Sequence, residues 1–140
     1  MSTIKERQEE IIDEFSMFDD WTERYEYIID LGKSLPLIDE QYKKEENLIK
    51  GCQSQVWLHA EKVDDNVVFT ADSDAILTKG IIAVLVRVFS NQNPEEIMNS
   101  DMSFIDEIGL KEHLSPTRAN GLVSMMKQIK LYAIALQSNQ

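Results

Sequence analysis

The stretch from Ala75 to Phe89 constrains the fold most, because it is the most apolar part of the chain. Its β-branched residues favour a strand, but it is much longer than an ordinary strand of about five or six residues. The preceding Asp72-Ser73-Asp74 offers capping side chains and negative charge, which a helix N-terminus favours. We therefore predict a buried central helix. With Lys79 and Arg87 inside it, the stretch falls short of the ~18 apolar residues of a bilayer span.

A β-hairpin is predicted before this helix. Residues 56–61 alternate apolar and polar side chains, Asp64-Asp65-Asn66 supplies a turn, and residues 67–71 return. Residues 47–50 are a candidate third strand. If they pair, residues 51–54 form a tight loop at one end of the sheet.

The remaining apolar patterns have helical spacing and predict four more helices. They span residues 3–15, 20–31, a short segment from Pro94, and 116–137. The first begins with a capping box of Thr3 and Glu6, and Gly32 is expected to end the second in a left-handed conformation. No repeat or flexible linker interrupts the chain, so we expect one domain over residues 1–140.

The balance of charge narrows the classes of partner. The chain has 25 acidic and 14 basic residues, a formal charge of −11. Because phosphates and anionic membranes attract cations, we expect no nucleic acid and no membrane partner, but a protein or a small molecule. The N-terminus has no apolar signal core, so a cytoplasmic location is expected.

The last predicted helix is cationic on an acidic protein. No acidic residue follows Glu112, whereas residues 1–50 are rich in acids. This helix is expected either to pair with the acidic first helices or to offer Arg118, near its start, to a partner.

Cys52 is the only cysteine and the only strong nucleophile. A single cysteine excludes a disulfide or a multi-cysteine metal site within one chain. Its neighbours are small or polar, which predicts a turn that presents the side chain outward, and Lys50 would favour the thiolate electrostatically. The alternative is a buried, inert cysteine.

Other chemistry has little support in the sequence. His59 and His113 are the only histidines, and neither is spaced to form a triad with Cys52. No metal-ligand spacing and no glycine-rich phosphate loop are present, so no cofactor and no metal are expected.

Three segments in order resemble the SufE-type sulfur acceptor family. Residues 47–57 (NLIKGCQSQVW) resemble its cysteine-loop signature. Residues 72–75 followed by residues 79–83 are similar to the segment that enters its central helix. Residues 113–122 (HLSPTRANGL) resemble its C-terminal motif. The opening segment also fits the family, with Trp21 and residues 25–32 before Leu35-Pro36, so the set spans nearly the whole chain.

This resemblance implies both a fold and a function. The fold is α+β, a small antiparallel sheet of about three strands flanked by helices, shared with iron–sulfur scaffold proteins. The function is that of a sulfur acceptor. A SufS-like, pyridoxal-phosphate-dependent cysteine desulfurase donates persulfide sulfur to Cys52 and is stimulated in return. A SufB-like cluster-assembly scaffold then receives the sulfur. An accessory protein of this kind is a monomer or weak dimer without a cofactor of its own.

The resemblance also implies roles for individual residues. Cys52 would be the persulfide carrier, with Gly51, Gln53 and Ser54 shaping its loop. Asp74 and Arg118 would belong to the docking neighbourhood. Lys50 and the acid-rich segment before it are particular to this chain and bear on partner preference.

Two other functions stay open. The chain could be a binding module that activates a desulfurase allosterically, with Cys52 structural. It could also be a cluster scaffold, which would need ligands from two subunits.

Overall fold

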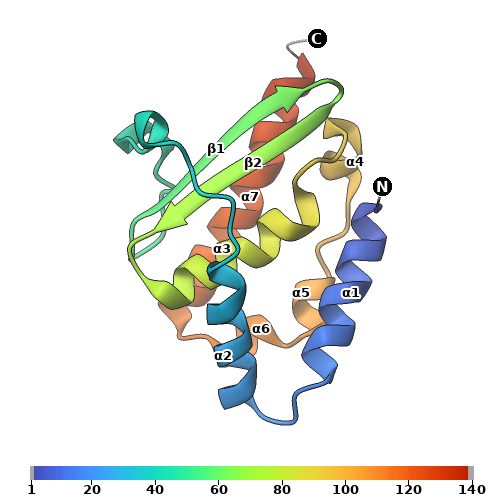
Figure 1. Ribbon diagram of the computed structural model, residues 1–140, viewed down its shortest axis with the longest axis vertical. Helices are drawn as coiled ribbons and strands as arrows, with labels where there is room; N and C mark the ends of the chain where they lie inside the picture. Colours follow the sequence, from blue (N-terminus) through green and yellow to red (C-terminus); the bar gives the residue numbers. More distant parts are fainter. Residues whose placement is uncertain (1, 139–140) are drawn as a thin grey trace.

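The computed structural model describes residues 2–138 and has an α+β fold (Figure 1). The helices are α1 (Ile4–Ser16), α2 (Trp21–Gly32), α3 (Ile76–Phe89), α4 (Pro94–Asn99), α5 (Phe104–Glu107), α6 (Leu110–His113) and α7 (Pro116–Ser138). The strands are β1 (Val56–Val63) and β2 (Asn66–Ser73), preceded by the short 3₁₀ turns η1 (Glu40–Tyr42) and η2 (Glu45–Asn47). The predicted fold class is confirmed, whereas α5 and α6 are not predicted by the sequence.

The sheet is a two-stranded antiparallel hairpin, so the prediction of about three strands is wrong. The predicted third strand makes only an isolated bridge between Leu48 and Trp57. It cannot continue, because Gly51 has a φ of 95° and turns the chain away from β1. The hairpin itself follows the alternation of its sequence: its apolar inner face is Val56, Leu58, Val67, Phe69 and Ala71, all completely buried.

Helix α3 is the predicted central helix, and it packs against α2 and β2. The crossing with α2 is unusually close. A Cβ at Gly80 would collide with the backbone carbonyl of Ile28, and one at Gly32 would lie 3.1 Å from the Gly80 nitrogen. Gly32 itself is the last helical residue of α2 and has no positive φ. The prediction that it ends α2 in a left-handed conformation is therefore wrong. Its small size, rather than its freedom of φ, is what this position requires.

The predicted cap of α3 is also wrong. Ala75 occupies the N-cap, and no side chain caps the helix. Asp72 instead forms ion pairs with Lys43, at 3.0 Å, and Lys79, at 3.3 Å. Asp72 thus connects the segment before β1 to the start of α3 through lysine side chains, rather than by capping backbone groups of the helix.

The outer helices enclose the core from several sides. Helix α1 starts with the predicted capping box, and Arg87 of α3 forms ion pairs with its Glu10 and Glu14. Helix α7 lies behind the hairpin in Figure 1 and packs mainly on α4 and α3, not on the acidic α1 and α2. Its Lys130 donates hydrogen bonds to the carbonyls of Met98 and Ser100.

Across residues 2–138, no helix is long and apolar enough to cross a membrane.

The segment between α2 and β1 crosses the outer side of the hairpin. A parallel bridge from Leu37 to Ala71 attaches it at the β2 edge, and the bridge from Leu48 to Trp57 attaches it at the β1 edge. Figure 1 shows this segment, with η1 and η2, at the left of the hairpin. This segment leads directly into the loop that carries Cys52.

Candidate functional site

The loop of residues 50–55 lies at the start of β1 and carries Cys52. A hydrogen bond of 2.8 Å from the Ile49 nitrogen to the Val56 carbonyl closes its base, and both of these side chains are buried. Gly51 is required here on two grounds. Its φ of 95° is rare for residues with a side chain, and a Cβ there would lie 2.5 Å from the Ser124 hydroxyl oxygen. The loop is therefore fitted against α7.

The Cys52 side chain points inward, not outward as the sequence predicts. It is half-buried, and its S–H donates a hydrogen bond to the Gly121 carbonyl of α7, with sulfur and oxygen 3.7 Å apart. Gly121 allows this approach, because a Cβ there would lie 3.3 Å from the sulfur. Small size at Gly121 thus makes room for the thiol.

Burial raises the pKa of the Cys52 thiol. The sequence predicts that Lys50 favours the thiolate, but this lysine is exposed and forms no ion pair with any residue from 2 to 138. Desolvation therefore decides the ionisation of the thiol. In this conformation it is protonated at neutral pH and is a weak nucleophile.

A cavity of about 50 Å³ lies beside the thiol, and we call it the Cys52 cavity. It is lined by Cys52, Gln53, Ser54, Thr78, Ile81, Thr117, Arg118, Gly121 and Met125. The structure thus brings four of the predicted site residues together around one small space: Cys52, Gln53, Ser54 and Arg118. Arg118 is exposed at the start of α7.

The other predicted residues lie outside the cavity. Asp74 fixes the end of the loop, because its carboxylate accepts a hydrogen bond from the Gln55 nitrogen (3.0 Å) and its own nitrogen donates to the Gln55 carbonyl. Gly51 packs on Ser124, and Lys50 faces solvent. The predicted docking roles of Asp74 and Arg118 stay predictions.

The sequence analysis names as site residues neither Ser124, which packs on Gly51, nor the other five residues that line the cavity: Thr78, Ile81, Thr117, Gly121 and Met125. Two of these residues are unusual for their place in the sequence and could have been noticed there. Gly121 interrupts a long helical pattern, where glycine costs about 1 kcal/mol relative to alanine. Thr78 is a polar residue within the most apolar segment of the chain. Ser124 gives no such signal.

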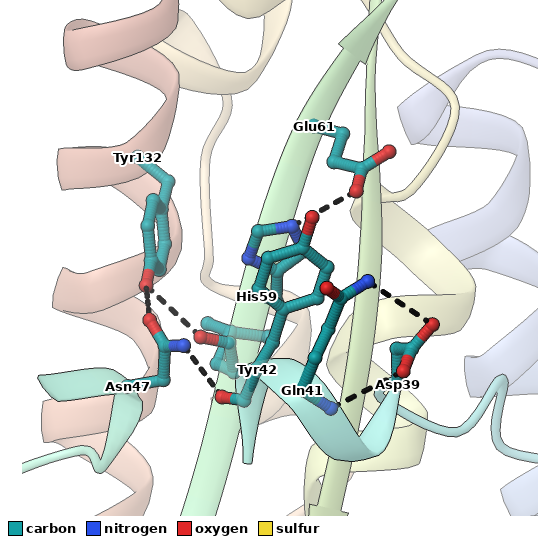
Figure 2. A network of polar contacts seen from close by, with 8 residues as sticks. Asp39, Gln41, Tyr42, Asn47, His59, Glu61 and Tyr132 are labelled. Carbon is teal, nitrogen blue, oxygen red and sulfur yellow. Dashed lines mark hydrogen bonds and ion pairs between the residues drawn. The ribbon is translucent and has the colours of Figure 1, made fainter. Parts of the chain in front are cut away.

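Both histidines are engaged elsewhere. The His59 ring stacks on Tyr42 with centroids 3.8 Å apart, and its Nε2 lies 3.0 Å from a Glu61 carboxylate oxygen (Figure 2). The His113 ring stacks on Trp21 at 3.9 Å. Neither histidine lines the Cys52 cavity, so no cysteine–histidine pair is assembled. In the part of the chain that the structure describes, no cluster of His, Cys, Asp or Glu could hold a metal ion.

A much larger cavity of about 1040 Å³ lies between α1 and the α4–α5 region. Its lining contains neither cysteine nor histidine and none of the predicted site residues. We therefore place the candidate site at the smaller Cys52 cavity, where the only strong nucleophile lies.

Comparison of the whole chain with solved structures identifies a close fold match. The solution structure of a hypothetical protein from Thermus thermophilus superposes with a TM-score of 0.79, covering 94% of this chain and 96% of that one. The sequences are only 16% identical, so this likeness shows the fold alone.

Comparison of the sequence identifies the family. Residues 9–133 match the model of the SufE family, the Fe-S metabolism associated domain. An uncharacterized SufE-like protein of Rhizobium meliloti (strain 1021) is 43% identical over 127 residues, covering 87% of this chain and 91% of that protein. Another from Rhizobium etli is 42% identical, with 87% and 86% covered. The chain therefore belongs to the SufE family, whose domain is associated with iron–sulfur metabolism.

Proposed function

We propose that this chain is a cytoplasmic sulfur acceptor that carries sulfur as a persulfide on Cys52. The donor is a pyridoxal-phosphate-dependent cysteine desulfurase of the SufS-like kind, and the recipient is a SufB-like cluster-assembly scaffold. One observation carries the proposal. In a chain of the SufE family, the only cysteine lies on a short loop beside a cavity of about 50 Å³.

The transfer is a thiol exchange between two proteins. Cys52 loses its proton, and its thiolate attacks the terminal sulfur of the donor persulfide. A new S–S bond forms on Cys52 while the S–S bond of the donor breaks, and the donor cysteine leaves as a thiolate that takes up a proton. No net oxidation or reduction occurs, so no further reactant is needed. The same exchange then passes the sulfur to the recipient.

The cavity supports the carrier role because it offers shelter for one added atom. A single water needs about 10–15 Å³ of such space, so about 50 Å³ leaves room for a sulfur bonded to Cys52. Ile81 and Met125 provide apolar walls. A persulfide held there would meet small reductants less often than one exposed on the surface.

Sulfur transfer requires the loop to open. The thiol faces the Gly121 carbonyl, and burial raises its pKa, so the docked donor must draw Cys52 outward before it can ionise and react. The base of the loop is held by Ile49, Val56 and the Gln55–Asp74 pair. We expect residues 50–54 to move as a flap between these fixed points.

Mass spectrometry of the protein after incubation with a cysteine desulfurase and cysteine tests the proposal. We expect one added sulfur atom, mapped to Cys52, and none in Cys52→Ser, which differs at a single atom. Recovery of unmodified Cys52 while the desulfurase turns over would overturn the carrier role.

The half-buried, hydrogen-bonded thiol also favours a second candidate, an allosteric activator with a structural cysteine. Under that alternative, Cys52→Ala would stimulate the desulfurase as strongly as the original chain does. Under the carrier proposal, stimulation that depends on removal of product sulfur is lost in Cys52→Ala.

A further inference from the structure

Thr78 is a buried polar residue whose side chain has no partner in the part of the chain that the structure describes. It lies in the first turn of α3 and is 6% exposed. Among the residues described, Gln92 is the other buried polar residue. Gln92 donates a hydrogen bond of 2.9 Å to the Ser2 carbonyl. The Thr78 side chain makes no hydrogen bond within residues 2–138. A hydroxyl left in this state is destabilising, so its presence in an apolar helix needs an explanation.

Two observations direct the unpaired hydroxyl toward the Cys52 cavity, which Thr78 lines. No completely buried side-chain oxygen or nitrogen in the described part of the chain lacks a hydrogen-bond partner. The Thr78 oxygen must therefore reach open space, and the cavity beside Cys52 is the space that Thr78 lines. Because the cavity is only about 50 Å³, a sulfur atom held in it lies close to its lining residues, and Thr78 is one of them.

We propose that the Thr78 hydroxyl donates a hydrogen bond to the terminal sulfur of the Cys52 persulfide, which makes Thr78 a binding residue for the carried sulfur. This inference rests on the proposed function. A persulfide is a stronger acid than a thiol, so its terminal sulfur is anionic at neutral pH and needs a donor when it leaves water. No bond is made or broken by Thr78, which only stabilises the loaded state.

The other groups around the cavity leave this task to Thr78. Of the described lining residues, α7 contributes the charged Arg118, the loop contributes Cys52 itself, and α3 contributes no charged side chain. Gln53, Thr117 and Arg118 are exposed and Ser54 is half-buried, so water competes for the donors of all four. Thr78 is the lining donor that is buried, where a hydrogen bond to an anion has its greatest effect.

Three variants and a direct loading reaction test the inference. Thr78→Val removes the hydroxyl and keeps the shape, Thr78→Ser keeps the hydroxyl, and Thr117→Val removes an exposed hydroxyl at the rim. Inorganic polysulfide loads Cys52 without a desulfurase: the thiolate takes one sulfur, and a polysulfide shorter by that atom leaves. The readout is the pH dependence of the near-ultraviolet absorbance of the persulfide anion, with intact mass as the check on loading.

In Thr78→Val we expect the persulfide to ionise about one pH unit higher, which is about a tenfold loss of anion stabilisation. Thr78→Ser and Thr117→Val should match the original chain. The thermal stability of unloaded Thr78→Val should be equal or higher, because an unpaired hydroxyl is removed. A purely structural role of Thr78 would instead lower the thermal stability and leave the ionisation of the persulfide unchanged. An unchanged ionisation midpoint in Thr78→Val would overturn the inference. Loading by polysulfide but not by a desulfurase would overturn the proposed function and leave the inference standing.

Discussion

Two groups of polar side chains flank β1, and they differ in how completely their hydrogen bonds are satisfied. One is a network that lies over the outer side of the hairpin and extends to Tyr132 of α7 (Figure 2). It consists of Asp39, Gln41, Tyr42, Asn47, His59, Glu61 and Tyr132, and we call it the outer-face network. Six of its members have a side-chain hydrogen-bond partner, and Tyr42 takes part through its backbone carbonyl and through the stacking of its ring on His59. Around the Cys52 cavity, by contrast, Thr78 has no partner among residues 2–138, and Cys52 has one long contact with sulfur and oxygen 3.7 Å apart.

This difference distinguishes polar groups that stabilise the fold from polar groups that are free to bind a ligand. The Tyr132 hydroxyl donates to the Leu58 carbonyl at 2.9 Å and lies 3.4 Å from the Asn47 side-chain oxygen. The Asn47 amide in turn donates to the Tyr42 carbonyl. This network ties the chain before the cysteine loop to β1 and α7. A satisfied network can hold a segment rigidly, whereas unsatisfied groups remain available to a ligand.

The largest effect is expected at the boundary between the two groups, in Gly51→Ala. A non-glycine residue in this conformation costs about 1–3 kcal/mol, and the added carbon would lie 2.5 Å from the Ser124 oxygen. The loop should therefore lose its fit against α7, and we expect lower stability in chemical denaturation together with faster alkylation of Cys52.

Gly109→Ala is the matched control. Gly109 has a φ of 72°, but a Cβ there meets nothing closer than 3.5 Å. It should lose stability through its backbone without changing the alkylation rate of Cys52. Equal alkylation rates for Gly51→Ala and the original chain would show that the loop does not depend on its contact with Ser124.

The second effect concerns the outer-face network alone. Tyr132→Phe removes one hydroxyl and leaves the Leu58 carbonyl without that donor, which costs about 1–2 kcal/mol. Tyr132 does not line the Cys52 cavity, so sulfur loading onto Cys52 should be unchanged. Denaturation and loading measured on the same preparation check both statements. A variant of full stability that loads poorly would contradict the division between the two groups.

The sequence predicts those parts of the molecule that local patterns determine. The length and apolarity of residues 75–89 identify α3, and alternation around Asp64 identifies the hairpin. The cysteine loop can be located because its glycine and polar residues interrupt these patterns. The helices α5 and α6 are missed because four residues are too few to show a period.

The direction of the Cys52 side chain cannot be predicted in the same way. It is decided by Gly121, which is 69 residues further along the chain, and by the cavity wall that α3 provides. The same holds for Gly32, whose local signal suggests a helix end but whose tertiary contact with Gly80 requires its small size. Burial of a loop residue is a property of packing, and local sequence carries little information about it.

A smaller effect is expected in Gly121→Ala. Alanine favours the helix by up to about 1 kcal/mol, but its Cβ would lie 3.3 Å from the Cys52 sulfur. The two terms oppose each other, so stability should change by less than about 1 kcal/mol while the thiol moves outward and is alkylated faster. Adding Cys52→Ser, whose oxygen is smaller than sulfur, should reveal the helix stabilisation in denaturation experiments. Additive effects of the two substitutions would show that they do not interact.

The smallest effect is the dependence of stability on pH. Burial raises the pKa of Cys52 in the folded chain above the value of about 8.5 for an exposed cysteine. The folded state therefore favours the protonated thiol, and this contribution is present in full below the unfolded pKa. It is lost as the pH rises through the folded pKa. The difference in unfolding free energy between the original chain and Cys52→Ser should be flat up to about pH 8 and decline above it. A difference that stays flat into the alkaline range would mean that the thiol already behaves as an exposed group, and the contrast between the two polar groups would then lose its physical basis.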